Sequence, residues 1–69
     1  MKFQVIKTTD SQWLGLQFEF PTDNPLDMIG VKFPITEDID MDIEEITQMP
    51  NGNWNISNPN YTAICRVVE

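Results

Sequence analysis

The sequence predicts a mainly β protein: a single small domain, residues 1–69, with five or six short strands in a strongly curved antiparallel sheet or small barrel. Three observations support this prediction. Several short runs alternate apolar and polar side chains, turn-forming residues separate these runs, and the chain is too short for more than one core. Four Phe, two Trp and one Tyr supply enough large apolar side chains for that core.

The first third of the chain predicts a hairpin. Residues 2–7 alternate as a short strand, and Thr8–Ser11 carries turn-forming side chains. Residues 12–20 give the clearest strand pattern, with Trp13 on one face. The other face carries four large apolar side chains at a period of two: Leu14, Leu16, Phe18 and Phe20.

The middle of the chain has a less regular pattern. Residues 21–30 contain two Pro, two Asp and a Gly, which predicts an irregular connection, and residues 31–33 resume an extended pattern. Residues 36–47 fit two structures. Ile39, Met41 and Ile43 alternate with acids as in a half-buried strand, whereas apolar residues at helical spacing fit a helix. We favour the strand, because the residues that follow also have a strand pattern. A helix over residues 36–47 would make the fold α+β.

The last third predicts a three-stranded meander. Residues 50–52, Pro-Asn-Gly, form a strong turn signal between strands at 46–49 and 53–57. A second turn, Asn58–Asn60, leads to the strand 61–68. This last strand is apolar on both faces, and such a strand is usually central in its sheet.

Charge narrows the possible functions. The formal net charge is 4 − 11 = −7, and residues 36–69 carry −6 of it. Phosphate neutralisation needs clustered Lys and Arg, so direct nucleic-acid binding and anionic membranes are disfavoured. We expect a cytoplasmic protein, because the single cysteine allows no internal disulfide and no apolar run is long enough to span a membrane.

Residue types that carry catalysis are scarce, so we expect no enzyme and no cofactor. The chain has no His, so Cys65 has no His partner, and it lies in an apolar strand where a thiol behaves as a small hydrophobic group. Asp38, Asp40 and Asp42 resemble the start of a calcium loop. However, Ile43 and Met49 stand where that loop needs Gly and a bidentate Glu, so we expect no metal site.

Residues 37–45, the acidic run, are the strongest candidate for a binding site. If this segment is extended, one face presents a carboxylate about every 6.7 Å, roughly the spacing of nucleic-acid phosphates, from Asp38, Asp40, Asp42 and Glu44. An ordinary solvated edge strand shows the same pattern. Trp13 and Trp54 are candidate contacts too, because Trp is enriched at interfaces, although the simpler interpretation is that both cover the second side of the small core. The predicted partner-binding residues are Asp38, Asp40, Asp42, Glu44, Glu45, Trp13 and Trp54.

These features predict a non-enzymatic acidic protein that docks on a basic protein. One such role is inhibition of a nucleic-acid-handling protein by mimicry of nucleic acid, as small phage or mobile-element proteins do. The alternative is a structural or assembly subunit that self-associates. Salt dependence separates the two, since charge-steered binding weakens as ionic strength rises.

Overall fold

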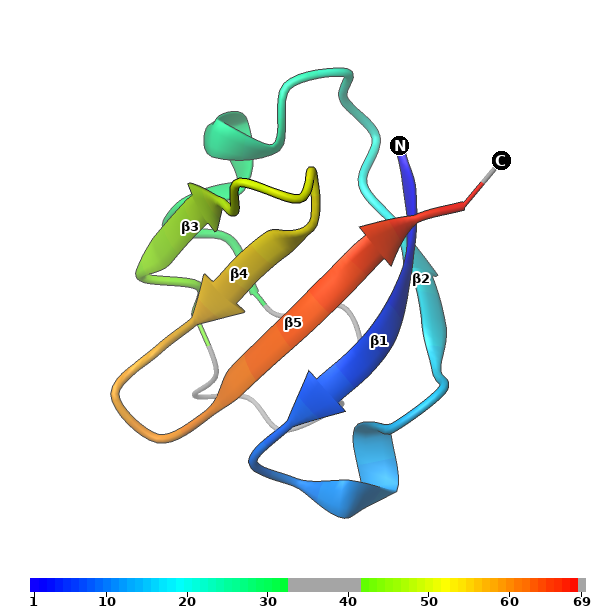
Figure 1. Cartoon of the computed structure of the whole chain (residues 1–69). Helices are drawn as coiled ribbons and strands as arrows, with labels where there is room; N and C mark the ends of the chain where they lie inside the picture. The colour runs from blue at the N-terminus through cyan, green and yellow to red at the C-terminus, as the bar shows by residue number, and fades with distance from the viewer. Residues whose placement is uncertain (33–41, 69) are drawn as a thin grey trace.

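The computed structural model, which describes residues 1–32 and 42–68, is a five-stranded antiparallel sheet (Figure 1). The strand order is β2-β1-β5-β4-β3. The prediction of a small, mainly β fold is confirmed. The elements are β1 (Lys2–Thr8), η1 (Ser11–Trp13), β2 (Gln17–Glu19), η2 (Pro25–Met28), β3 (Glu45–Gln48), β4 (Trp54–Ser57) and β5 (Thr62–Val67), where η1 and η2 are single turns of 3-10 helix.

The carboxy-terminal meander forms as predicted. Gly52 has a φ of 89°, which residues with a Cβ rarely adopt, and its N–H donates to the carbonyl of Met49 at 2.9 Å. The N–H of Met49 in turn donates to the carbonyl of Asn53 at 2.7 Å, which joins β3 to β4. The second turn is held by the side-chain oxygen of Asn58, which accepts from the backbone of Tyr61 at 2.9 Å.

Strand β5 is the central strand, as its two apolar faces predicted. It pairs with β4 on one side and with β1 on the other, and Cys65 lies opposite both Trp54 and Val5. The β1–β5 register shifts between Val5 and Lys7, which leaves Ile6 as an extra residue. Such a bulge bends a strand and increases its twist.

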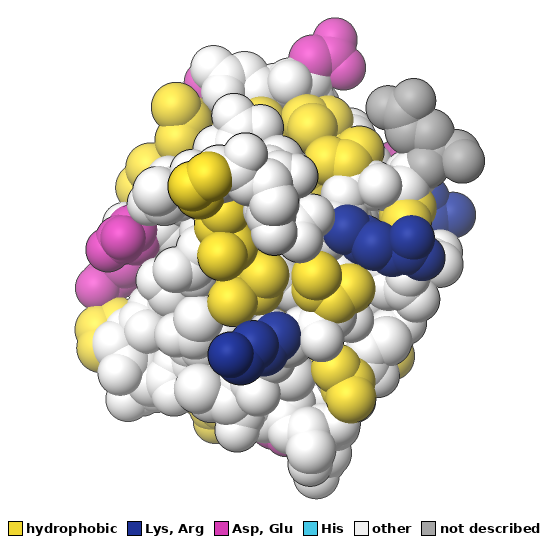
Figure 2. Space-filling view, viewed as in Figure 1, with side chains coloured by type: hydrophobic (Ala, Val, Ile, Leu, Met, Phe, Trp, Pro, Cys, Tyr) yellow, Lys and Arg dark blue, Asp and Glu magenta, His cyan; other side chains and the backbone are white. Residues whose placement is uncertain are grey.

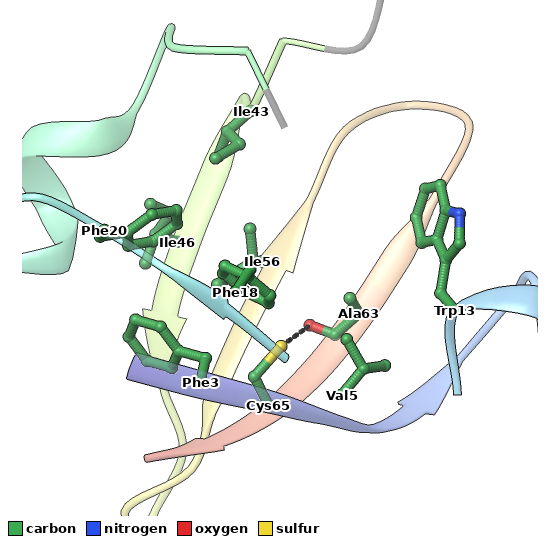
Figure 3. Close-up of a cluster of buried hydrophobic side chains, with 10 residues drawn as sticks. All are labelled: Phe3, Val5, Trp13, Phe18, Phe20, Ile43, Ile46, Ile56, Ala63 and Cys65. Atoms are coloured by element: carbon green, nitrogen blue, oxygen red, sulfur yellow. Dashed lines mark hydrogen bonds between the residues drawn. The ribbon is translucent and has the colours of Figure 1, made fainter. Parts of the chain in front are cut away.

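One face of the sheet carries the hydrophobic core (Figure 3). Three aromatic rings form its centre: Phe3 stacks on Phe18 at 5.4 Å between ring centroids and meets Phe20 edge-on at 5.2 Å. Such pairs contribute about 0.5–1.5 kcal/mol beyond the burial of their area. The core side chains are Phe3, Val5, Trp13, Phe18, Phe20, Ile43, Ile46, Ile56, Ala63 and Cys65.

The predicted strand over 12–20 is only partly correct. Phe18 and Phe20 are buried as predicted, but Leu14 and Leu16 are exposed and Trp13 is buried in their place. The cause is local. The side chain of Asp10 caps η1 by accepting from the N–H of Gln12 at 3.0 Å, and the chain then turns through Gly15 at a φ of 84°. The strand pattern therefore begins only at Gln17, after the turn.

The helix considered for residues 36–47 is not formed in its described part. Glu45 and Ile46 belong to β3, and the N–H of Ile43 donates to the carbonyl of Val31 at 2.9 Å in an extended pairing. An isolated bridge pairs Lys32 with Asp42. Residues 36–41 of that prediction lie outside the described residues.

Removing one methylene group from a buried side chain tests the packing of the core. Ile56 is fully buried between β3 and β5, so we expect Ile56→Val to lower the free energy of unfolding by about 1 kcal/mol. The matched control is Ile29→Val, where the side chain is half exposed and the change should stay within about 0.5 kcal/mol. Urea unfolding followed by Trp fluorescence measures both; equal losses would contradict this core assignment.

The outer face of β4 contains a buried acceptor to which none of the described residues donates. The side-chain oxygen of Asn55 is inaccessible and accepts no hydrogen bond from the described residues. Because an unsatisfied buried oxygen costs about 1–3 kcal/mol and Val suits a strand, we expect Asn55→Val to raise the free energy of unfolding by about 1 kcal/mol. Ser57→Val, on the same face of β4, gains only the strand preference and is the control. If both variants change stability equally, the oxygen carries no penalty.

Candidate partner-binding surface

The described part of the acidic run lies at the open side of β3. The side chains of Asp42, Glu44 and Glu45 are exposed, and Ile43 and Ile46 beside them are buried in the core. The run is therefore anchored by its isoleucines and presents its carboxylates to solvent. Asp38 and Asp40 lie outside the described residues.

Exposed and buried residues do not alternate regularly in the described run, because Glu44 and Glu45 are both exposed between the buried Ile43 and Ile46. The N–H of Glu44 donates to the carbonyl of Ser57 at 2.9 Å, and Glu45 is the register partner of the same Ser57. Glu44, just before β3, and Glu45, its first residue, thus both lie opposite Ser57, which is the two-against-one arrangement of a bulge. Regular alternation, on which the predicted ladder of carboxylates depends, is broken at this point.

An exposed apolar segment lies directly beside these carboxylates. It comprises Leu26, Ile29 and Val31, which are 49%, 49% and 42% exposed. The pairing with the acidic run is held by backbone hydrogen bonds, because the N–H of Gly30 donates to the carbonyl of Ile43 at 2.7 Å and Ile43 donates back to Val31. Large side chains that stay this exposed next to a folded core mark a candidate contact surface.

We call these residues together the β3 surface. Its apolar members are Leu26, Ile29 and Val31, and its charged members are Asp27, Asp42, Glu44, Glu45 and Lys32. With four carboxylates and one ammonium group, its formal charge is 1 − 4 = −3. Figure 2 shows Asp and Glu side chains at the β3 side of the sheet, with hydrophobic side chains nearby. The surface thus combines an apolar centre with a negative rim.

Sequence reasoning missed the apolar half of this surface. Residues 21–30 predicted only an irregular connection, since their prolines and acids obscure any period. A signal was nevertheless present. Asn24 before Pro25, with Gly30 following, is the signature of a short capped turn, and Asn24 does accept from the N–H of Leu26 at 3.2 Å. A turn of one helical repeat cannot bury every apolar side chain that it carries.

The two tryptophans pack with the core. Trp13 is 6% exposed and lies on Tyr61 at 4.7 Å between ring centroids. Trp54 is half-buried, lies opposite Cys65 and Gln48 in the sheet, and packs against the core cluster. Trp13 therefore offers a partner almost no surface, whereas Trp54 offers part of its ring. Neither belongs to the β3 surface.

The described residues hold neither an enclosed pocket nor a group of three metal-ligating side chains. Cys65 lies in the core, where its thiol donates to the carbonyl of Ala63 at 3.8 Å. Burial raises the pKa of the Cys65 thiol from 9.0 to about 12, so the thiol keeps its proton at pH values where an exposed thiol ionises. A protonated, inaccessible thiol is a poor nucleophile.

Over residues 1–32 and 42–68, no helix has the length and apolarity needed to cross a lipid bilayer. Comparisons of the chain with protein families, with curated proteins and with solved structures gave no match. The case for function therefore rests on the surface itself.

The raised pKa of Cys65 predicts an alkaline loss of stability. The folded thiol keeps its proton above pH 9.0 while the unfolded thiol releases it, so the stabilisation present below pH 9.0 falls as the pH rises toward about 12. We expect a loss of about 1.4 kcal/mol from about pH 8 to about pH 10, relative to Cys65→Ala over the same range. Urea unfolding at each pH measures it. Parallel pH dependences for the two proteins would refute the assignment.

Proposed function

We propose that this protein is a non-enzymatic binding protein that docks its β3 surface on a basic partner protein. The observation that carries the proposal is the side-by-side placement of three exposed apolar side chains and four exposed carboxylates. Protein interfaces commonly combine an apolar centre with a polar rim. In such an arrangement the apolar centre contributes most of the affinity, and the charged rim increases the association rate and the specificity for a partner of opposite charge.

The negative charge of the rim of the β3 surface determines which kind of partner it attracts. A formal charge of −3 over so few residues repels acidic surfaces and attracts clustered Lys and Arg. The apolar side chains then require a partner that also exposes hydrophobic groups among its basic ones. Nucleic-acid-handling proteins have such basic surfaces, so inhibition of one of them is the role that we favour, in the cytoplasm, where a lone thiol stays reduced.

Close mimicry of phosphate spacing is a narrower form of this proposal. It depends on Asp38 and Asp40 continuing a regular series from Asp42, and both of these lie outside the described residues. The bulge at Glu44 and Glu45 interrupts such a series at its other end. The proposal therefore rests on charge and apolar contact together, and not on a phosphate-like repeat.

A charge-matched pair of variants tests this function. Glu44→Gln/Glu45→Gln neutralises two carboxylates of the β3 surface, and Asp10→Asn/Glu19→Gln neutralises two exposed or partly exposed carboxylates elsewhere. Both variants have a net charge of −7 + 2 = −5. Tagged wild type and both variants are used for pull-downs from a bacterial lysate, at low and high salt, and captured proteins are identified by mass spectrometry and then purified.

With the purified partner, we expect the Glu44/Glu45 variant to bind about tenfold more weakly, which is about 1.4 kcal/mol for two rim charges. The Asp10/Glu19 variant should bind like the wild type, because its changes lie away from β3. Titration calorimetry gives the three affinities. A partner that binds all three proteins equally, or loses affinity equally with both variants, rules out docking through the β3 surface.

A further inference from the structure

A second exposed apolar surface lies at the opposite edge of the sheet. It consists of Ile6, Leu14 and Leu16, with Leu14 the most exposed at 59%. Backbone hydrogen bonds bring these residues together: Val5 donates to the carbonyl of Leu16 at 2.9 Å, and Gly15 donates to the carbonyl of Val5 at 2.9 Å. Because β2 and β3 are the two edge strands, this surface and the β3 surface lie on opposite sides of β5.

The charges around this second surface are mainly basic. The guanidinium of Arg66 donates from Nε to the side-chain oxygen of Gln4 at 2.9 Å, and the amide of Gln4 donates to the carbonyl of Gly15 at 3.3 Å. This chain of contacts ties Arg66 to the turn between Leu14 and Leu16. Lys7 follows Ile6 and is exposed. Figure 2 shows Lys and Arg side chains over β1 and β5, beside hydrophobic side chains.

We call Ile6, Leu14 and Leu16, with Lys7 and Arg66, the β1–β2 surface. In β1, β2, β5 and the turn around η1, the charged side chains are Lys2, Lys7, Arg66, Asp10 and Glu19, so the formal charge there is 3 − 2 = +1. The β3 surface carries −3. An acidic protein therefore has one apolar surface with a negative rim and another with a positive rim, three residues of apolar centre in each.

We propose that the β1–β2 surface of one copy of this chain docks on the β3 surface of a second copy, head to tail. The inference rests on the proposed function, since it uses the same β3 surface and pairs it with the positive rim of a second copy. Each apolar centre then covers the other, and Lys7 and Arg66 face Asp42, Glu44 and Glu45. Opposite charges at the rim favour this arrangement, and like charges disfavour the alternatives.

The same charges disfavour a symmetric contact through the β3 surfaces. Two copies meeting face to face there would bring −3 against −3, and a contact through two β1–β2 surfaces would oppose the two Lys7 ammonium groups. A head-to-tail contact is heterologous, so an open assembly keeps one unused β3 surface at one end and one unused β1–β2 surface at the other. Mixing two variants, each of which lacks one of the two surfaces, therefore distinguishes head-to-tail association from symmetric dimerisation.

The mixing experiment uses one variant for each surface. Leu14→Gln/Leu16→Gln removes the apolar centre of the β1–β2 surface, and Leu26→Gln/Ile29→Gln removes that of the β3 surface. All four side chains are exposed, so the fold should persist, which circular dichroism and thermal unfolding verify. Sedimentation velocity at increasing concentration then gives the mass of wild type, of each variant and of their equimolar mixture.

We expect wild type to rise above the 8.0 kDa of one chain as concentration increases, and each variant alone to remain at 8.0 kDa. The mixture should give a species of twice that mass, because each variant retains the surface that the other lacks. Self-association of either variant alone would overturn the head-to-tail arrangement. So would a wild type and a mixture that both stay at 8.0 kDa.

Zero-length carbodiimide cross-linking of the wild type provides a test without substitutions. Mixed nitrogen-14 and nitrogen-15 chains should give cross-links between Lys7 of one copy and Glu44 or Glu45 of another, visible as mixed-isotope peptide pairs. Absence of these pairs under conditions where association is measured contradicts the contact. A monomeric chain that still captures a partner through Glu44 and Glu45 would end this inference and leave the proposed function standing.

Discussion

The pairing of β1 with β5 is the constraint on which the rest of the structure depends. It joins residues more than 60 positions apart, such as Phe3 and Val67, and it places Cys65 and Ala63 between Val5 and Ile56 in the core. Without it the chain would form two separate sheets, the meander of β3, β4 and β5 and the hairpin of β1 and β2, and a two-stranded hairpin is only marginally stable alone. Contacts of this sequence separation have a large closure entropy, so the apolar burial along β5 must offset it.

The sequence was sufficient to predict those elements whose turns are encoded by local chemistry. The Pro50–Gly52 turn predicted the meander, because Pro and Gly at these positions fit few turn conformations. The strand at 61–68 predicted the central position of β5, because a strand that is apolar on both faces is usually central in its sheet. Residues 12–20 were harder. Their period of two holds only if the strand runs unbroken, and capping by Asp10 with a turn at Gly15 shifts the register, so that burial of one large indole replaces burial of two leucines.

The candidate surface was only half visible in the sequence. Its carboxylates form a run that composition alone reveals, but its apolar side chains come from a connection with no period, brought beside the run by the hydrogen bonds between Gly30, Val31 and Ile43. The distribution of charge along the sequence also differs from its distribution in the folded protein. Arg66 belongs to the acidic half of the sequence, yet β1–β5 pairing brings it to Gln4, on the same side of the molecule as Lys7.

Net charge is therefore a poor guide to what this protein can contact. A value of −7 suggests mutual repulsion, but at about 0.15 M salt the screening length is about 8 Å, whereas the molecule measures 27 × 24 × 19 Å. Charges at the β3 edge contribute little to the potential at the opposite edge. The potential at each surface is set by its own few charges, and one small sheet carries two exposed apolar surfaces with rims of opposite sign. The folded arrangement of the charges, and not their sum, determines which surfaces attract each other.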